Sequence, residues 1–190
     1  MSNAEHIHAR MNRPLLVIFM TLALVAVASA QALQSLYTDL GEKKCKTLEV
    51  NNEGAGYSIQ QCPGVAGYKI IIEEGDLRQT IKVVRPNGSK HDLGLAMTIG
   101  GGGFSHVGPR AEWRVKTQSG KTVPVALIVR FNVSENAEDA TKETSYLAVA
   151  KITPQQICLT DSVKPGPGQN EEARRLADSS ATKPCLRVPE

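Results

Sequence analysis

The sequence predicts a mainly β domain, an antiparallel meander or sandwich-like sheet with one short C-terminal helix. Three observations favour this fold. Short runs rich in β-branched residues are separated by turns that contain glycine and asparagine, as in consecutive hairpins. Residues 111–116 alternate apolar and polar side chains, which is typical of a half-buried strand. After a break rich in proline and glycine, residues 170–179 instead show helical spacing.

Residues 1–30 have the pattern of a signal peptide and are expected to precede the folded domain. A basic flank leads into an apolar run at 15–27, and Ala28 and Ala30 complete the Ala-x-Ala motif for cleavage after position 30. A membrane anchor is the alternative, but a spanning helix needs about 20 apolar residues, and this run is shorter. Whether Met11 is the true start stays open.

The remaining residues, 31–190, are expected to form a single disulfide-stabilised domain. All four cysteines lie in it, and an even number of cysteines in an exported chain indicates two disulfides. Of the three possible connectivities we favour Cys45–Cys62 and Cys158–Cys185, because closing a short loop costs less entropy. The sequence has neither Cys-x-x-Cys nor a zinc-like group of cysteines and histidines, so we expect no metal site and no cofactor.

The first half of the domain is predicted to form hairpins. Lys44–Val50 and Tyr57–Cys62 are expected to be strands around an Asn/Gly turn. Tyr68–Glu73 and Arg78–Arg85 are rich in Ile and Val, and Gly75 between them is expected to take the positive φ of a bulged turn. The Asn-Gly pair that follows predicts a further tight turn.

The second half begins with a glycine run at 100–103, for which we expect a flexible loop or a hairpin tip. In the alternating strand beyond it, Trp113 lies on the apolar face and is expected in the core. Val123–Val133 and Tyr146–Ile152 contain apolar residues on both faces, which predicts central strands that are covered on both sides.

The end of the chain is predicted to be a polar connection, about 134–144, and then a helix, about 170–179. Glu171 and Glu172 would lie in the positive first turn of this helix, as its dipole favours. A helix this short is marginal alone, so a disulfide from Cys158 to Cys185 would help to hold it against the sheet.

The charge balance excludes some partners. The chain has a net charge of +3 over 190 residues, and no cluster of Lys and Arg stands out. We therefore expect no nucleic-acid partner, and membrane contact only through the transient signal peptide. A protein or a cell-envelope component remains possible, and the charged strand faces at Glu112, Arg114 and Lys116, with Arg78, are candidate contact surfaces.

The glycine run is the most prominent candidate site, as a mobile loop that could close over a partner. It is followed by a strand and matches neither phosphate-binding glycine motif, so we do not expect it to hold a phosphate. The candidate binding loop consists of Gly100, Gly101, Gly102, Gly103, Phe104, Ser105 and His106.

No catalytic residue is assigned. Ser105 and His106 are adjacent, and adjacent side chains rarely point at one another; no Gly-x-Ser-x-Gly elbow surrounds the serine. The three carboxylates at 73–76 lack the spacing of a calcium loop.

Several further blocks of the chain form a recognisable pattern: Tyr37–Leu40, Cys62–Gly64, Glu74–Gln79, Ala111–Arg114, Leu127–Ser134, Cys158, Asp161, Val163–Gly166 and Asn170–Asp178. Together they resemble an uncharacterised family of small exported bacterial proteins that has no assigned activity. The resemblance implies export, periplasmic or extracellular.

The leading functional hypothesis is a non-enzymatic binding module for a protein or a cell-envelope component. One alternative is a secreted or periplasmic hydrolase that uses His106 or His91 as a base. Another is an inhibitor of a secreted hydrolase, for which four consecutive glycines would make a poor rigid wedge.

Overall fold

The structure is a computed structural model, and it describes residues 32–136, 139 and 141–187. The predicted signal peptide and its cleavage site lie outside the described residues. Within the described ranges, no helix is long and apolar enough to cross a membrane.

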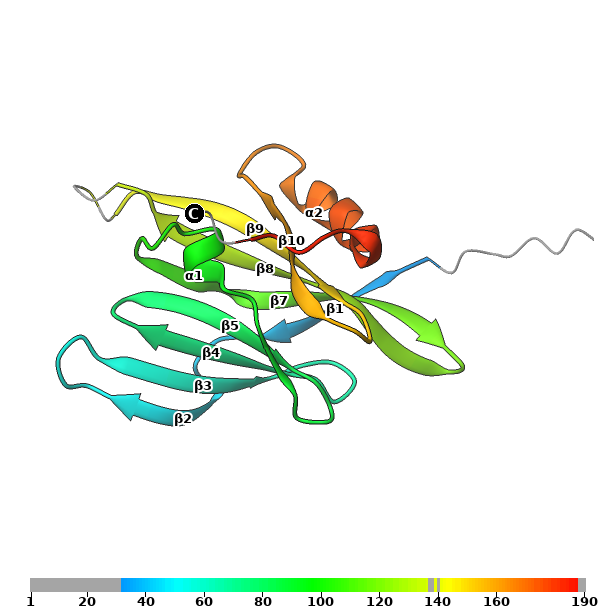
Figure 1. Cartoon of the computed structure of the whole chain (residues 1–190), viewed down its shortest axis with the longest axis horizontal. Coiled ribbons are helices and arrows are strands. Elements are labelled where there is room, and N and C mark those ends of the chain that lie inside the picture. Colours follow the sequence, from blue (N-terminus) through cyan, green and yellow to red (C-terminus); the bar gives the residue numbers. More distant parts are fainter. Residues whose placement is uncertain (1–31, 137–138, 140, 188–190) are drawn as a thin grey trace, which may run out of the picture. The chain divides into compact units, whose positions relative to one another are not determined.

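Ten strands of the described chain pair into one sheet, in the order β10-β9-β8-β7-β5-β4-β3-β2, with β1 on β7 and β6 on β5 (Figure 1). The bounds are β1 Gln34–Asp39, β2 Lys46–Asn51, β3 Tyr57–Pro63, β4 Lys69–Gly75, β5 Arg78–Val84, β6 Lys90–Asp92, β7 Ser105–Gln118, β8 Lys121–Ser134, β9 Glu143–Ile152 and β10 Ile157–Val163. The prediction of a mainly β meander is confirmed. Strands β1 and β10 were not expected from the sequence.

The sheet consists of two antiparallel meanders that meet at one point. Strands β2–β5 form the first and β7–β10 the second, and β5 joins β7 through a single parallel pairing, Arg78 with Ser105. The sheet is therefore mixed rather than wholly antiparallel.

One core lies between the two meanders. It contains Ile70, Ile81 and Val83 from the first meander with Leu127 and Phe131 from the second, all essentially inaccessible to solvent. This shared core is the sandwich-like packing that the sequence predicts.

Trp113 lies in this core, as predicted. Its ring packs 6.0 Å from that of Tyr68, measured between centroids, and its indole nitrogen donates to Thr38 Oγ1 at 2.9 Å. The one polar atom of this buried ring is therefore hydrogen-bonded.

The opposite face of β8 and β9 is covered by helix α2, Gln169–Asp178 (Figure 1). Ala173 and Ala177 of the helix pack on Ile128 and Val149 of the sheet. Both predictions are confirmed here: the C-terminal helix forms, and the two central strands are covered on both sides.

Both favoured disulfides are present. Cys45–Cys62 joins the residue before β2 to β3, and Cys158–Cys185 joins β10 to the C-terminal segment, with Cα–Cα distances of 4.1 Å and 5.7 Å. The pairs indicate that the chain folds in an oxidising, non-cytoplasmic compartment.

The glycine run differs from the predicted loop. It follows a one-turn helix, α1 (Leu95–Thr98), that was not expected, and the amides of Gly100 and Gly102 bond back to the carbonyls of Leu95 and Ala96. A Cβ on Gly100 would lie 2.7 Å from the Ala96 oxygen, so this position requires glycine. The run therefore forms a tight hydrogen-bonded turn that ends the helix.

The loop also ends earlier than expected. Strand β7 begins at Ser105 and reaches Ala111 through an irregularity in its pairing with β8. Ser105 and His106 of the candidate binding loop are therefore strand residues.

The turn between β4 and β5 corrects a second prediction. Asp76 and Leu77 take positive φ, 50° and 59°, whereas Gly75 pairs with Arg78 as the last residue of β4. This is the two-residue turn whose twist suits a hairpin, and it places a leucine in the left-handed region.

Leu77→Gly is expected to stabilise the protein by about 0.5–1 kcal/mol, because it removes this strain and creates the preferred Asp-Gly pair at an exposed position. Thermal unfolding should show a rise in Tm of about 1–3 °C. The matched control is Leu48→Gly in β2, also exposed but without positive φ, which should lower Tm. A lower Tm for both variants would contradict the expectation.

Candidate functional site

The face of the sheet beneath α2 carries charged side chains that the sequence does not show as a group. Because side chains alternate along a strand, Arg110, Glu112 and Arg114 of β7 share one face. Glu112 and Arg114 were expected as solvent-facing contact residues. They instead bond to helix α2 and are mostly buried, with 12% and 10% of their side chains exposed.

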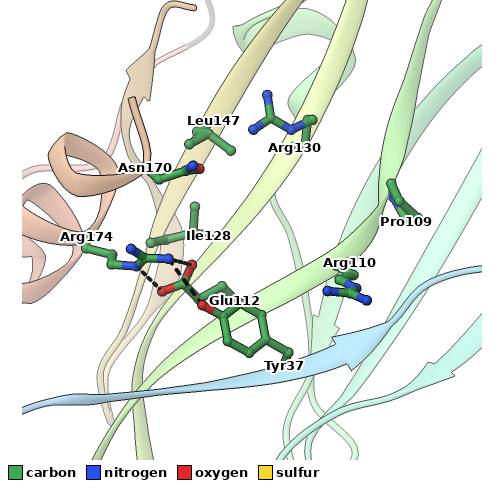
Figure 2. Close-up of a pocket in the computed structure, with 9 residues that line it drawn as sticks. All are labelled: Tyr37, Pro109, Arg110, Glu112, Ile128, Arg130, Leu147, Asn170 and Arg174. Carbon is green, nitrogen blue, oxygen red and sulfur yellow. Dashed lines mark hydrogen bonds and ion pairs between the residues drawn. The ribbon is translucent and has the colours of Figure 1, made fainter. Parts of the chain in front are cut away.

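Glu112 is held by Arg174 of α2. Arg174 donates from Nε to Oε1 at 2.7 Å and from Nη2 to Oε2 at 3.2 Å (Figure 2). Ser35 Oγ of β1 donates to the same carboxylate. Burial raises the pKa of Glu112, but the hydrogen bonds from Arg174 and Ser35 outweigh it and hold this pKa below its ordinary value. Glu112 is therefore a structural anion.

Arg114 forms the second ion pair with the helix. Its Nε and Nη2 donate to the two carboxylate oxygens of Asp178 at 2.7 Å and 2.9 Å. This fork-like geometry is the strong form of the arginine–carboxylate pair.

Beside these pairs lies a cavity of about 320 Å³ between the sheet and the start of α2, which we name the α2 cavity (Figure 2). Its floor includes the buried side chains of Ile128 and Leu147. The full lining is Tyr37, Pro109, Arg110, Glu112, Ile128, Arg130, Leu147, Asn170 and Arg174.

Two arginines of this lining have no carboxylate partner among the described residues. Arg130 donates to neutral acceptors, Ser145 Oγ at 2.9 Å and Gln169 Oε1 at 3.3 Å. Arg110 makes no hydrogen bond or ion pair within the described ranges, and its neighbour on β1, Asp39, accepts instead from the Gly41 amide at 2.7 Å.

The backbone makes room for Arg130. A Cβ on Gly108, in the irregular part of β7, would lie 2.7 Å from the Cβ of Arg130, so any larger residue there would displace the arginine. Gly108 thus leaves the space in which a cationic side chain lies at the cavity.

The candidate binding loop lies at a different cavity, of about 560 Å³. Gly100–Phe104 contribute to its lining, with Arg78, Ser134, Glu135 and Asn136. Its charged groups are largely paired within the protein: Arg78 bonds to Asp76 and to the Gly102 carbonyl and stacks on Phe104. Glu135 accepts from Tyr146, which raises the pKa of Tyr146 to about 12.

The two candidate bases of the hydrolase hypothesis lie on different strands. His106 Nε2 is 3.0 Å from Asn132 Nδ2, and its Nδ1 is 3.4 Å from Glu143. The neighbouring Ser105 is buried, and its hydroxyl is without a hydrogen-bond partner in the described structure. Ser105 and His106 therefore do not form a nucleophile–base pair in this structure.

His91 accepts a hydrogen bond from Arg85 Nε at 3.1 Å. Burial, and then the positive charge of Arg85, lower its pKa. A general base is usually oriented by a carboxylate, and here a cation takes that place. Within the described ranges, no group of three His, Cys, Asp or Glu residues is placed to hold a metal ion.

Comparison of this chain with models of protein families, with curated proteins and with solved structures finds no match. The function proposed below comes from the chemistry of the described residues.

Sequence reasoning missed the α2 cavity because its residues come from four strands and a helix that are distant along the chain. A partial signal was present. The charges of Arg110, Glu112 and Arg114 alternate at strand spacing, and Arg174 and Asp178 alternate at helical spacing in a complementary order.

Proposed function

We propose that this chain is an exported, non-enzymatic binding domain for a protein or a cell-envelope component, acting in the periplasm or outside the cell, and that the α2 cavity is its ligand site. The proposal rests on one observation: the same cavity has a buried apolar floor and two arginines that lack carboxylate partners in the described chain. Small-ligand sites commonly combine such a floor with a few convergent polar groups.

The surrounding structure favours a preformed site. The ion pairs of Glu112 and Arg114 with α2 hold the helix against β7, and both elements line the cavity, so a ligand would enter without a large rearrangement. For the alternative of a hydrolase, His106 lies 3.4 Å from the Glu143 carboxylate but is not paired with Ser105, and His91 is paired with Arg85 rather than with a carboxylate.

Filling the cavity should abolish binding. Asn170 is exposed in the first turn of α2 and lines the cavity, so Asn170→Trp would occupy it without disturbing the core. With oxidised protein as the bait in an envelope extract, the wild type should retain a component that Asn170→Trp loses.

The matched control is Glu171→Trp, an exposed neighbour outside the cavity lining, which should retain the component. Equal recovery with all three proteins, or no specific component with the wild type, would refute the assignment of this cavity. Thermal unfolding of both variants would show that they are folded.

A further inference from the structure

We propose that the α2 cavity binds an oxyanion, a carboxylate or a phosphate, that is attached to a short apolar group, with Arg110 and Arg130 as its cationic ligands. The inference rests on the proposed function, because it names the ligand chemistry of the same site.

The ion pairs between the sheet and α2 follow a regular order. Residues four apart lie on one face of a helix, and Asp178 pairs with Arg114 and Arg174 with Glu112. Thus each of these two helix charges meets the opposite charge on β7.

The next residue along this face of α2, and the next along this face of β7, do not continue the alternation of paired charges. One turn earlier in α2 the residue is the neutral Asn170, and the next residue on this face of β7 is Arg110. Both line the α2 cavity together with Arg130. If the alternation of charge continued, residue 170 would be acidic and would pair with Arg110. It is a neutral asparagine instead, and a cavity lies between the two elements.

The two arginines also lie on neighbouring strands and on the same face. Ala111 pairs with Val129 and both point into the core, so Arg110 and Arg130 beside them belong to the opposite face. Both side chains line the α2 cavity, so both are available to an anion bound there.

The cavity also limits the rest of the ligand. Ile128 and Leu147 are nearly fully buried and form part of its floor, and at about 320 Å³ the volume is near the lower end for small-ligand sites. This favours an oxyanion on a short apolar group over a bare inorganic ion.

The test is isothermal titration at low salt with four probes: acetate, hexanoate, inorganic phosphate and hexyl phosphate. We expect hexanoate to bind more tightly than acetate, and hexyl phosphate more tightly than inorganic phosphate, by about fourfold for each methylene that becomes buried. Comparing hexanoate with hexyl phosphate shows whether the site prefers a carboxylate or a phosphate.

Arg110→Gln and Arg130→Gln should each weaken binding of the preferred probe at least tenfold, whereas Arg187→Gln, the same change at an exposed arginine outside the cavity, should not. Arg110 is exposed and makes no hydrogen bond or ion pair within the described residues, so its variant should fold with a Tm close to that of the wild type.

No binding of any probe by the wild type, or unchanged binding by Arg110→Gln and Arg130→Gln, would overturn the inference. If the oxyanions fail but Asn170→Trp still loses its envelope component, the ligand chemistry is wrong and the proposed function stands.

Discussion

Reduction of both disulfides is expected to unfold the protein in buffer in which the oxidised form is stable. The bridges join cysteines that are 17 and 27 residues apart, and each should contribute about 3 kcal/mol by restricting the unfolded chain. Their sum is comparable to the whole stability of many domains, about 5–15 kcal/mol. Urea unfolding with and without dithiothreitol would measure the difference.

Removing the bridges one at a time should show that they are not equivalent. Cys62 is 1% exposed in the core, whereas Cys158 and Cys185 are partly exposed. The double replacement of Cys45 and Cys62 by Ala should therefore cost more than that of Cys158 and Cys185, although it opens the shorter loop. The reverse order, or reduced protein that remains folded, would contradict this expectation.

Glu112→Gln is expected to destabilise the protein by about 2–3 kcal/mol. The substitution keeps the shape of the side chain but leaves Arg174 without its carboxylate, beside Arg114 and Arg110. The loss should be smaller than the 3–5 kcal/mol typical of a fully buried pair, because the Arg174 side chain is 35% exposed. Chemical denaturation at pH 7 would measure it, and Glu171→Gln, at an exposed position of the same helix, is the control.

The destabilisation caused by Glu112→Gln should become smaller as the pH falls. The pKa of Glu112 is lower in the folded state than its ordinary value of 4.5, so its stabilisation is present above that value. It is lost as the pH falls through the folded-state pKa. Below pH 4.5 the difference in free energy of unfolding between the wild type and Glu112→Gln should therefore decrease. A gap that stays constant from pH 7 to pH 3 would contradict the assigned role.

Local pattern was sufficient for much of the fold. The alternation at 111–116 and the doubly apolar run Val123–Val133 identified β7 and β8, because one strand's periodicity reflects which of its faces are buried. The cysteine pairs were also predictable, since each joins segments that are near in sequence. Short elements were missed: α1 has four residues, too few for a helical period.

Other features depended on pairing between distant segments. Strand β1 was not predicted because it is stabilised by β7, over 70 residues away along the chain, and not by a hydrophobic pattern of its own. The turn at 76–77 was placed one residue early, because the register of β4 against β5 decides which residues form the turn.

By itself, the sequence determined the class of fold, the two covalent links and the helix that ends the domain, because these follow from neighbours along the chain. Only the tertiary structure decided that Arg110 and Arg130 share a cavity without a carboxylate partner in the described chain, while Glu112 and Arg114 are paired beneath α2. The reason is physical: a charged group acquires its role from the charges and the dielectric around it, and folding brings those together from distant parts of the chain.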